Sequence, residues 1–253
     1  MIAAGMRALI GLVVPRRCLA CDEPLDPERG GRVCGDCLDS FGDLSFEAIP
    51  CCPSCGIPTG PSGASDTPCG PCTSLPPPFA VARAWGFHDD ALRDAILRLK
   101  FGGRTALAVP LGALLAHAAE ALPPADAIVA VPLHASRLRE RGFNQAAMLA
   151  RAAARILALP VLSRALVRTR ATGPQTALDR ASRAANVRGS MRASPRRVSG
   201  VRVLLVDDVF TTGATAAAAA HALLDAGATS VVVATVARAA RLEAAASATM
   251  NAP

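Results

Sequence analysis

The sequence predicts an α/β protein with a doubly wound, mostly parallel sheet, preceded by a small cysteine-rich metal-binding module. Three observations carry this prediction. All nine Cys and 12 of the 20 Pro lie in residues 1–78, which hold only six of the 54 Ala. An aliphatic run at 201–206 leads through a turn into an Ala-rich helix, as a buried parallel strand does. Charge divides at the same place, with a net charge of −4 for residues 1–78 and +11 for residues 79–253.

The change in composition near Pro76 to Pro78 places a domain boundary there. We expect four segments: an apolar segment at 1–17, the metal-binding module at 18–75, the α/β domain at 79–240 and a disordered tail at 241–253. Arg7 interrupts the N-terminal segment and no small-residue cleavage site follows it, so we favour a short packed helix over a secretory signal. A chain that is not exported stays in the reducing cytoplasm, where a disulfide framework is not expected.

Eight of the cysteines form four C-x-x-C pairs, each of which can hold a metal ion in a knuckle. The pairs are Cys18 and Cys21, Cys34 and Cys37, Cys52 and Cys55, and Cys69 and Cys72. Twelve residues separate the first two pairs and 13 the last two, which predicts two consecutive ribbons, each with one zinc site made of four cysteines. Spacing alone leaves open whether sequential or crossed pairs share a metal. Residues 1–78 contain no His, so we expect structural zinc, and we interpret Cys51 as a spare thiol.

The predicted strand at 201–206 runs into two acids, Asp207 and Asp208, and then into a hydroxyl-rich turn at 211–215. The helix that follows reaches about Leu224 and stops at Gly227. Backbone amides and hydroxyls at a helix N-terminus can surround a phosphate group. The two carboxylates suit instead the hydroxyl groups of a sugar, or a magnesium ion.

A second apolar strand, at 127–131, is followed by Arg137, Arg139 and Arg141 and then by a helix that begins around residues 141–145. Residues 137–202 carry 15 Arg against two acidic residues. Guanidinium groups bind phosphate oxygens well, so this excess indicates a polyanionic partner, either polyphosphate or nucleic acid. Lys100 is the single Lys, and no Gly-Lys-Ser or Gly-Lys-Thr sequence occurs, which excludes a P-loop nucleotidase.

The run V-L-L-V-D-D-V-F-T-T-G-A-T at 203–215 resembles the motif that binds 5-phosphoribosyl-1-pyrophosphate (PRPP) in type I phosphoribosyltransferases. The resemblance implies that Asp207 and Asp208 bind the ribose hydroxyls. It also implies a loop for the 5-phosphate, made of Thr211, Thr212, Gly213, Ala214 and Thr215. Purine-salvage members have an Asp where this chain has Thr211, which argues against a hypoxanthine- or guanine-type acceptor.

The strand end at 131–133 resembles the pyrophosphate loop of the same family. This implies pyrophosphate contacts from Val131, Pro132, Leu133 and Arg137. Residues 168–189 resemble the mobile catalytic flap of amidophosphoribosyltransferase-like members, with the candidate catalytic residues Gln175, Arg180, Arg183 and Asn186. Such a flap would exclude water from the reacting ribose as it closes.

The whole order of motifs resembles the ComF competence family: four cysteine pairs, L-R-L-K-F-G-G at 97–103, R-G-F-N-Q at 141–145 and the phosphate loop. The resemblance implies a double zinc ribbon fused to a type I phosphoribosyltransferase domain, with structural zinc ions, and magnesium bound with PRPP. It links the chain to imported single-stranded DNA and to competence or DNA-uptake proteins. The Ala-rich run at 212–225 is too short and too polar at its ends to cross a bilayer, so we expect no membrane span. Lys100 lies in the L-R-L-K-F-G-G motif, where it suits either a phosphate contact or the C-terminal end of a helix that begins near Asp89.

Three functions remain open at this level. A phosphoribosyltransferase would bind PRPP and magnesium and transfer the phosphoribosyl group to an acceptor with loss of pyrophosphate. A non-enzymatic accessory would bind single-stranded DNA, although seven Phe and one Trp are few for a base-stacking platform. A regulator would sense PRPP without turnover. The sequence specifies neither the acceptor nor the oligomeric state.

Overall fold

A computed structural model describes residues 16–26, 31–43, 45–47, 49–59, 67–170 and 189–239. The predicted tail at 241–253 and most of the N-terminal segment lie outside these ranges. So do all four candidate flap residues, Gln175, Arg180, Arg183 and Asn186.

The centre of the molecule is a four-stranded parallel sheet in the order β1-β6-β5-β2. The strands are β1 (Val81–Phe87), β2 (Ala127–Ala130), β5 (Arg202–Phe210) and β6 (Ser230–Arg238). Alternate residues of the two inner strands face two separate hydrophobic clusters: Leu204 lies in one and Leu205 in the other. The predicted α/β class with a parallel sheet is confirmed, and burial on both faces explains the continuous aliphatic runs.

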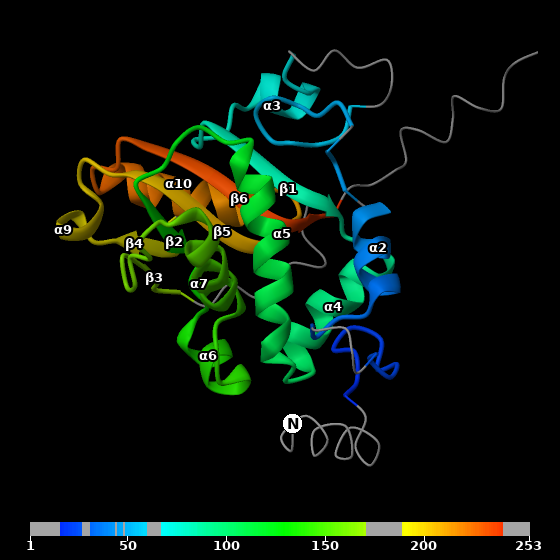
Figure 1. The fold of residues 1–253 in the computed structure, drawn as a ribbon. Helices are drawn as coiled ribbons and strands as arrows, with labels where there is room; N and C mark the ends of the chain where they lie inside the picture. Colours follow the sequence, from blue (N-terminus) through cyan, green and yellow to red (C-terminus); the bar gives the residue numbers. More distant parts are fainter. Residues whose placement is uncertain are drawn as a thin grey trace, which may run out of the picture.

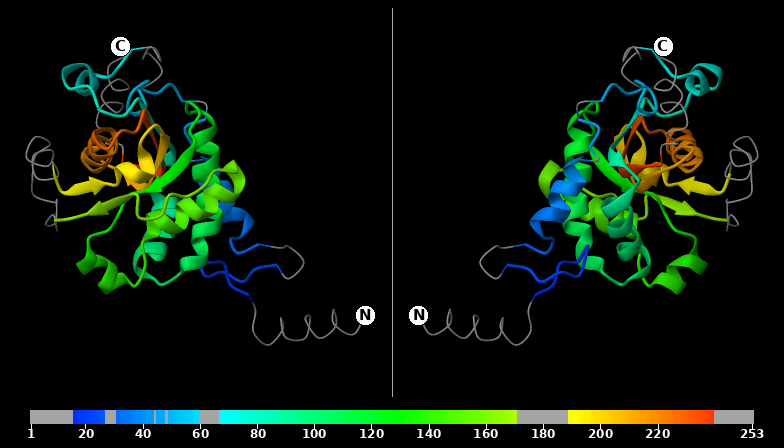
Figure 2. Two further views of the ribbon diagram at one scale, coloured as in Figure 1. Left: turned by 90° about the vertical axis from the view of Figure 1, so that its left-hand side faces the viewer. Right: turned by 90° about the vertical axis from the view of Figure 1, so that its right-hand side faces the viewer.

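Helices cover both faces of the sheet (Figure 1). One cluster includes helices α4 (Asp90–Phe101), α5 (Ala108–Glu120) and α7 (Gln145–Leu157). The other includes α10 (Ala214–Asp225) and an antiparallel hairpin of β3 (Leu166–Arg168) and β4 (Met191–Ala193). The hairpin projects from the sheet in Figure 2. Short helices η1 (Thr105–Leu107), α6 (Ala135–Arg141) and α9 (Pro195–Val198) complete this part of the chain.

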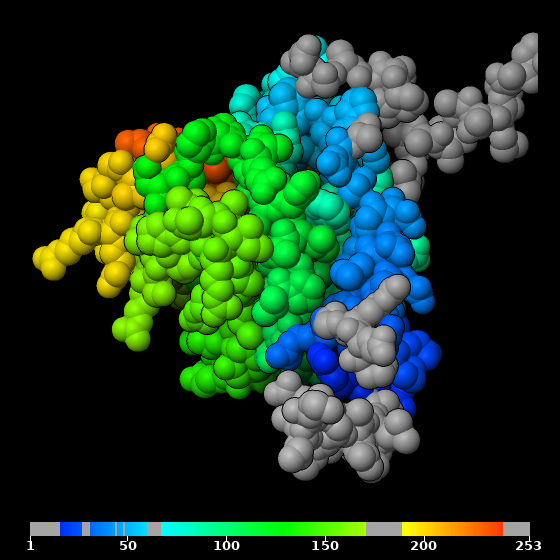
Figure 3. Space-filling model, in the orientation of Figure 1, coloured from blue at the N-terminus to red at the C-terminus, as the bar shows by residue number. Residues whose placement is uncertain are grey.

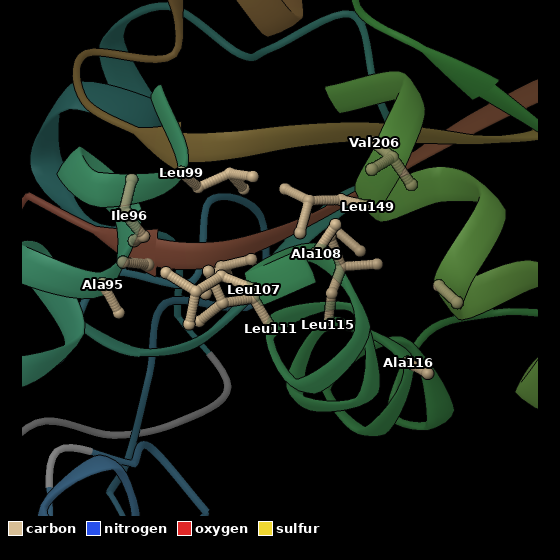
Figure 4. Close-up of a cluster of buried hydrophobic side chains, with 14 of the residues drawn as sticks. Ala95, Ile96, Leu99, Leu107, Ala108, Leu111, Leu115, Ala116, Leu149 and Val206 are labelled. Carbon is tan, nitrogen blue, oxygen red and sulfur yellow. The ribbon is translucent and has the colours of Figure 1, made fainter. Parts of the chain in front are cut away.

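Small residues let the helices of the first cluster approach closely. A Cβ atom on Gly112 of α5 would lie 2.4 Å from the Cβ atom of Ala152 on α7. Leu111, Leu115 and Leu149 then fill the space between these helices and the sheet, as Figure 4 shows. The high Ala content therefore builds a core from close backbone approach, with few bulky side chains.

The cysteine-rich part of the chain forms two ribbons, which join different hydrophobic clusters. The first ribbon, residues 16–43 with α2 (Gly35–Asp43), joins the cluster around α4 and α5 through Cys18, Cys37 and Phe41. The second ribbon, residues 51–74 with α3 (Gly70–Ser74), joins the cluster around α10. Figure 3 shows the blue and cyan atoms of both units along one side of the molecule.

The link between the ribbons runs along the edge strand β1. Ser45 forms an antiparallel bridge with Gly86, and the Phe46 amide donates to the Trp85 carbonyl at 2.8 Å. The Phe46 ring meets the Phe87 ring edge-on, with 4.5 Å between centroids. This link covers an otherwise open sheet edge.

Two elements differ from the sequence prediction. Strand β5 does not end at Val206 but continues through the two acids to Phe210, because its pairing with β6 extends to the Phe210–Arg238 register. Residues 135–141, expected as a loop, form α6, whose first turn is capped by the His134 ring accepting from the Ser136 amide at 3.3 Å.

Candidate active site at the carboxyl edge of the sheet

A cavity of about 360 Å³ lies where strands β2 and β5 end. Because the carboxyl ends of parallel strands meet at one edge of a sheet, loops far apart in sequence come together there. The residues that line it include Lys100, Val131, Pro132, Leu133, Arg137, Arg141, Gln145, Arg168, Asp207, Asp208, Thr211 and Thr215. The structure thus brings together the sequence-predicted acids, part of the phosphate loop and the strand end at 131–133.

The two acids lie at the base of this cavity. Asp208 is only 5% exposed, and its backbone amide donates to the Asp207 carboxylate at 2.9 Å. Burial, and then the negative charge of Asp208, raise the pKa of Asp207 well above its usual range. Oδ2 of Asp208 is buried and has no hydrogen-bond partner among the described residues. A buried acceptor without a donor suits an absent hydroxyl group or cation.

Lys100 forms an ion pair with this acid pair. Its Nζ lies 2.9 Å from Oδ1 of Asp208, and the two side chains are 17% and 8% exposed. Lys100 also stands in the last turn of α4, which begins at its N-cap Asp89. The sequence suggested phosphate or the helix end as its partner and gave no sign of the carboxylate, because no local pattern links positions 100 and 208.

Three arginines also line the cavity and bring positive charge to it. Arg137 and Arg141 extend from α6, and the Arg141 guanidinium lies over the Phe101 ring, 4.5 Å from its centroid. Arg168, on β3, is the first residue of the segment that resembles the flap, but it was not predicted from the sequence as a site residue. Arg139, grouped with Arg137 by the sequence, is not among the lining residues.

The strand end at 131–133 is fixed by the helix that follows it. Asn144 donates from Nδ2 to the Val131 carbonyl at 3.0 Å, and its Oδ1 accepts from the Ala147 amide as the N-cap of α7. Gln145 is 5% exposed and lines the cavity, and its Oε1 has no hydrogen-bond partner in the described part of the chain. Asn144 and Gln145 both belong to the R-G-F-N-Q motif, but from the sequence this motif predicted only the start of a helix.

The phosphate loop lies at the N-terminus of α10. Gly213 is the N-cap with φ +79°, and the Ala214 amide donates to Oγ1 of Thr212 at 3.4 Å. A side chain at position 213 would place Cβ 2.7 Å from Cζ of Phe210, so the turn requires glycine for both conformation and space. Backbone amides and the helix dipole at the start of a 12-residue helix favour an anion there.

A larger cavity of about 670 Å³ lies on the other side of this loop. Its walls are mostly apolar and come from α10, the Pro76–Pro78 joint and the second ribbon. Arg238 connects this ribbon to the loop, because its Nη1 donates to the Cys55 carbonyl at 2.6 Å and its guanidinium lies 4.5 Å from the Phe210 ring centroid. Since charged groups gather in the smaller cavity, we place the candidate active site there.

Each ribbon brings four thiols together, in the sets Cys18, Cys21, Cys34, Cys37 and Cys52, Cys55, Cys69, Cys72. Within each set all sulfur atoms lie within 4.8 Å of one another. Zinc–sulfur bonds of about 2.3 Å in a tetrahedron separate the sulfurs by about 3.8 Å, and the Cys21–Cys34 and Cys55–Cys69 pairs are each 3.7 Å apart. The clusters therefore fit two structural zinc ions, and consecutive pairs share each site.

Backbone amides prepare one thiol in each set for metal binding. Burial alone would raise the pKa of Cys18, but amide donors led by that of Cys34 outweigh it and lower the pKa to about 7. The same balance lowers the pKa of Cys52 to about 6. Thiolates are the metal-binding form, so these two positions favour zinc before it arrives.

Among the helices of the described residues, none combines the length and apolar character that crossing a bilayer requires.

Comparison with known proteins matches both parts of the chain. A model of the double zinc ribbon domain matches residues 9–73, and a model of the phosphoribosyl transferase domain matches residues 144–250. The solved structure of glutamine PRPP amidotransferase from B. subtilis is 28% identical over 50% of this chain and 25% of its own, with a TM-score of 0.35.

Full-length relatives match most of the chain. The DNA utilization protein YhgH of Escherichia coli K12 is 36% identical over 228 residues, 88% of this chain and 96% of the relative. YhgH of Salmonella typhi is 35% identical over 229 residues with the same coverage. Competence protein F of Haemophilus influenzae is 30% identical over 207 residues, 79% of this chain and 86% of the relative. The chain therefore belongs to the ComF/YhgH family of DNA-utilization and competence proteins, which joins a double zinc ribbon to a phosphoribosyltransferase domain.

Proposed function

We propose that this protein binds PRPP with Mg²⁺ and transfers the phosphoribosyl group to an acceptor, with loss of pyrophosphate. The observation that carries the proposal is the single cavity that joins the acid pair, the start of α10 and the strand end at 131–133. Ribose hydroxyls, a 5-phosphate and a pyrophosphate need three different environments. The acid pair offers carboxylates, the start of α10 offers helix amides, and Arg137 of α6, just after the strand end, offers a guanidinium group.

Each group has a defined task in this proposal. Asp207 and Asp208 hold the ribose hydroxyls, and Thr211 to Thr215 hold the 5-phosphate at the helix N-terminus. Val131 to Leu133 and Arg137 orient the pyrophosphate. The bond between ribose C1 and the pyrophosphate oxygen breaks, while the acceptor bonds to C1 and releases its proton.

Magnesium suits the same acid pair. Hard cations prefer carboxylate and phosphate oxygens, and Oδ2 of Asp208 is buried without a described partner. When bound, the ion supplies charge neutralisation for the departing pyrophosphate. Arg137 and Arg168, which line the same cavity, add positive charge for the same leaving group.

Calorimetric titration with PRPP in the presence of MgCl2 tests this function. We expect saturable binding to the wild type and a loss of at least about tenfold in affinity for Asp207→Asn/Asp208→Asn, because two charged contacts are removed. Asp225→Asn, an exposed charge change at the far end of α10, is the matched control and should bind as the wild type does. No binding to the wild type, or equal binding by the double variant, would rule the proposal out.

Single-stranded DNA binding is a second candidate function. The names of the relatives refer to DNA utilization and competence, and exposed arginines outside the cavity, including Arg192, Arg196 and Arg197, offer phosphate contacts. Fluorescence anisotropy with a labelled oligothymidylate at increasing salt tests it. Salt-sensitive binding that survives Asp207→Asn/Asp208→Asn would show a function separate from PRPP.

The third candidate, a PRPP-sensing regulator, shares the binding site but not the reaction. PRPP binding without pyrophosphate release, in the presence of candidate nucleophiles, would favour it over the transferase. For all three functions we propose a reducing cytoplasmic location, which keeps the zinc ligands as thiolates.

A further inference from the structure

We propose that Lys100 occupies two positions in turn: in the ligand-free protein its ammonium group neutralises Asp208, and when a divalent cation takes that carboxylate it moves to the pyrophosphate of the bound ligand. Lys100 would thus be both a placeholder for the cation and a ligand for the leaving group. The inference rests on the proposed function, since it assumes that a magnesium-bound pyrophosphate group enters this cavity.

The first support is the charge balance of the cavity. Its described lining carries two carboxylates, three guanidinium groups and one ammonium group, and the ammonium group lies 2.9 Å from the Asp208 carboxylate. A buried carboxylate that loses its counter-ion is strongly destabilised, so an arriving divalent cation can displace Lys100 without leaving Asp208 unpaired. Two like-charged cations cannot then share Oδ1, and repulsion directs the ammonium group away from it.

The second support is an excess of acceptors around the ion pair. Oδ2 of Asp208 and Oε1 of Gln145 are both buried in the cavity wall without a described hydrogen-bond partner. Lys100 therefore pairs with Oδ1 of Asp208 but leaves these two buried acceptor atoms without a donor. A metal ion with its bound waters, or a ligand hydroxyl group, could supply the missing donors and charge.

The third support is that the backbone is held while the side chain can move. Leu92, Ile96 and Leu99 anchor α4 with no exposed surface, and the helix ends one residue after Lys100. The Lys side chain has four rotatable bonds and ends in a point charge, unlike a planar guanidinium group. Leu133 and Arg137 line the same cavity as Lys100, and in the proposal rotation about these bonds brings Nζ toward them.

Two binding measurements on Lys100→Met test the proposal, because the two positions predict effects of opposite sign. The probes are Mn²⁺ alone, followed by the loss of its free electron paramagnetic resonance signal, and pyrophosphate at saturating Mg²⁺, followed by calorimetry. We expect Mn²⁺ to bind about tenfold more tightly once the competing charge is removed, and pyrophosphate about tenfold more weakly. Arg93→Met, an exposed charge removal on the same helix, should change neither.

A purely structural ion pair predicts a different result. In that case Lys100→Met lowers the melting temperature but leaves pyrophosphate affinity within twofold of the wild type, and this outcome overturns the proposal. If Lys100→Met does not fold, Lys100→Met/Asp208→Asn is compared with Asp208→Asn alone, so that any further loss of pyrophosphate affinity belongs to Lys100. Lys100→Arg, which keeps the charge, should retain more pyrophosphate affinity than Lys100→Met.

The same data separate this inference from the proposed function. If the wild type binds pyrophosphate and PRPP but Lys100→Met binds them equally well, only the role of Lys100 is wrong. If the wild type binds neither, both proposals are overturned.

Discussion

The two ribbons have the same ligand set and both join the hydrophobic core, but their charged contacts with the α/β domain differ in burial. In the first ribbon, Asp22 pairs with Arg98 and Arg104, which flank the end of α4, and these side chains are 30–40% exposed. In the second ribbon, the carbonyl of Cys55 accepts a hydrogen bond from Arg238, a residue only 6% exposed. Exposed ion pairs contribute little, whereas a buried charged hydrogen bond is costly to break.

The two ribbons also lie next to different parts of the candidate active site. Arg238 lies over Phe210, and the Phe210 ring fills the space beside Gly213, so three successive contacts lead from Cys55 in the second ribbon to the phosphate loop. The first ribbon supports the end of α4, where Lys100 is located. Two copies of one metal-binding pattern therefore contact different parts of the candidate active site, and the charged contact of the second is the more deeply buried.

The largest effects should come from removing zinc from one ribbon at a time. We expect Cys18→Ser/Cys37→Ser and Cys52→Ser/Cys72→Ser each to lower the zinc content from about two to about one per chain, at a cost of several kcal/mol of folding free energy. The second pair should also abolish PRPP binding, whereas the first should weaken it only in part. Metal analysis with calorimetry on the purified variants checks both expectations.

Cys51→Ser is the matched control for these variants. Cys51 lies beside Cys52 but belongs to neither cluster, and its thiol donates to the Ile49 carbonyl at 3.2 Å. The zinc content of Cys51→Ser should equal that of the wild type. If both double variants affected PRPP binding equally, the difference between the ribbons would disappear.

Replacing the buried anchor of the second ribbon should have the next largest effect. Arg238→Met keeps much of the side-chain volume but leaves the Cys55 carbonyl without its donor, so we expect a loss of about 3 kcal/mol in the free energy of unfolding. PRPP affinity should fall as well, because Phe210 loses its neighbour. Urea denaturation and calorimetry measure the two effects; a stable variant with normal PRPP affinity would contradict the coupling.

Gly213→Ala tests the contact between Phe210 and Gly213, and Gly142→Ala is its control. Both glycines have a positive φ, +79° and +77°, but a Cβ atom at position 142 meets nothing within 4 Å. We expect about 1 kcal/mol of backbone strain at position 142, and about 2 kcal/mol at position 213, where the new methyl group also meets Phe210. Only Gly213→Ala should weaken PRPP binding. Equal stability losses would show that Phe210 adjusts freely.

The contacts that connect the ribbons and Lys100 to the candidate active site could not be predicted from the sequence. The four cysteine pairs, the strand before Asp207 and the helix after Gly213 follow from local patterns, because knuckles, aliphatic runs and turns are properties of neighbouring residues. The Lys100–Asp208 ion pair joins residues 108 positions apart, and the Arg238–Cys55 hydrogen bond joins residues 183 positions apart. Such contacts depend on sheet order and register, which no local pattern specifies.

Even the correctly predicted segments had errors at their ends. The strand before Asp207 was expected to stop at Val206, since acids seldom occupy a buried strand, but pairing with β6 carries it on to Phe210. For the same reason Asp208 is buried, and its need for a counter-ion explains the position of Lys100. The local sequence identifies the acids but neither their burial nor their partner.

The smallest effect should come from the exposed anchor of the first ribbon. Hydrogen bonds and charge from Arg98 and then Arg104 lower the pKa of Asp22 below its usual 3.8, so the carboxylate stabilises the fold only while it is ionised. Asp22→Asn should therefore lower the melting temperature slightly at neutral pH, less than Arg238→Met does. The difference from the wild type should shrink in high salt, because salt screens an exposed ion pair. Thermal melts at pH 7 in low and high salt measure this; a loss as large as that of Arg238→Met would show that the first ribbon is held as firmly as the second.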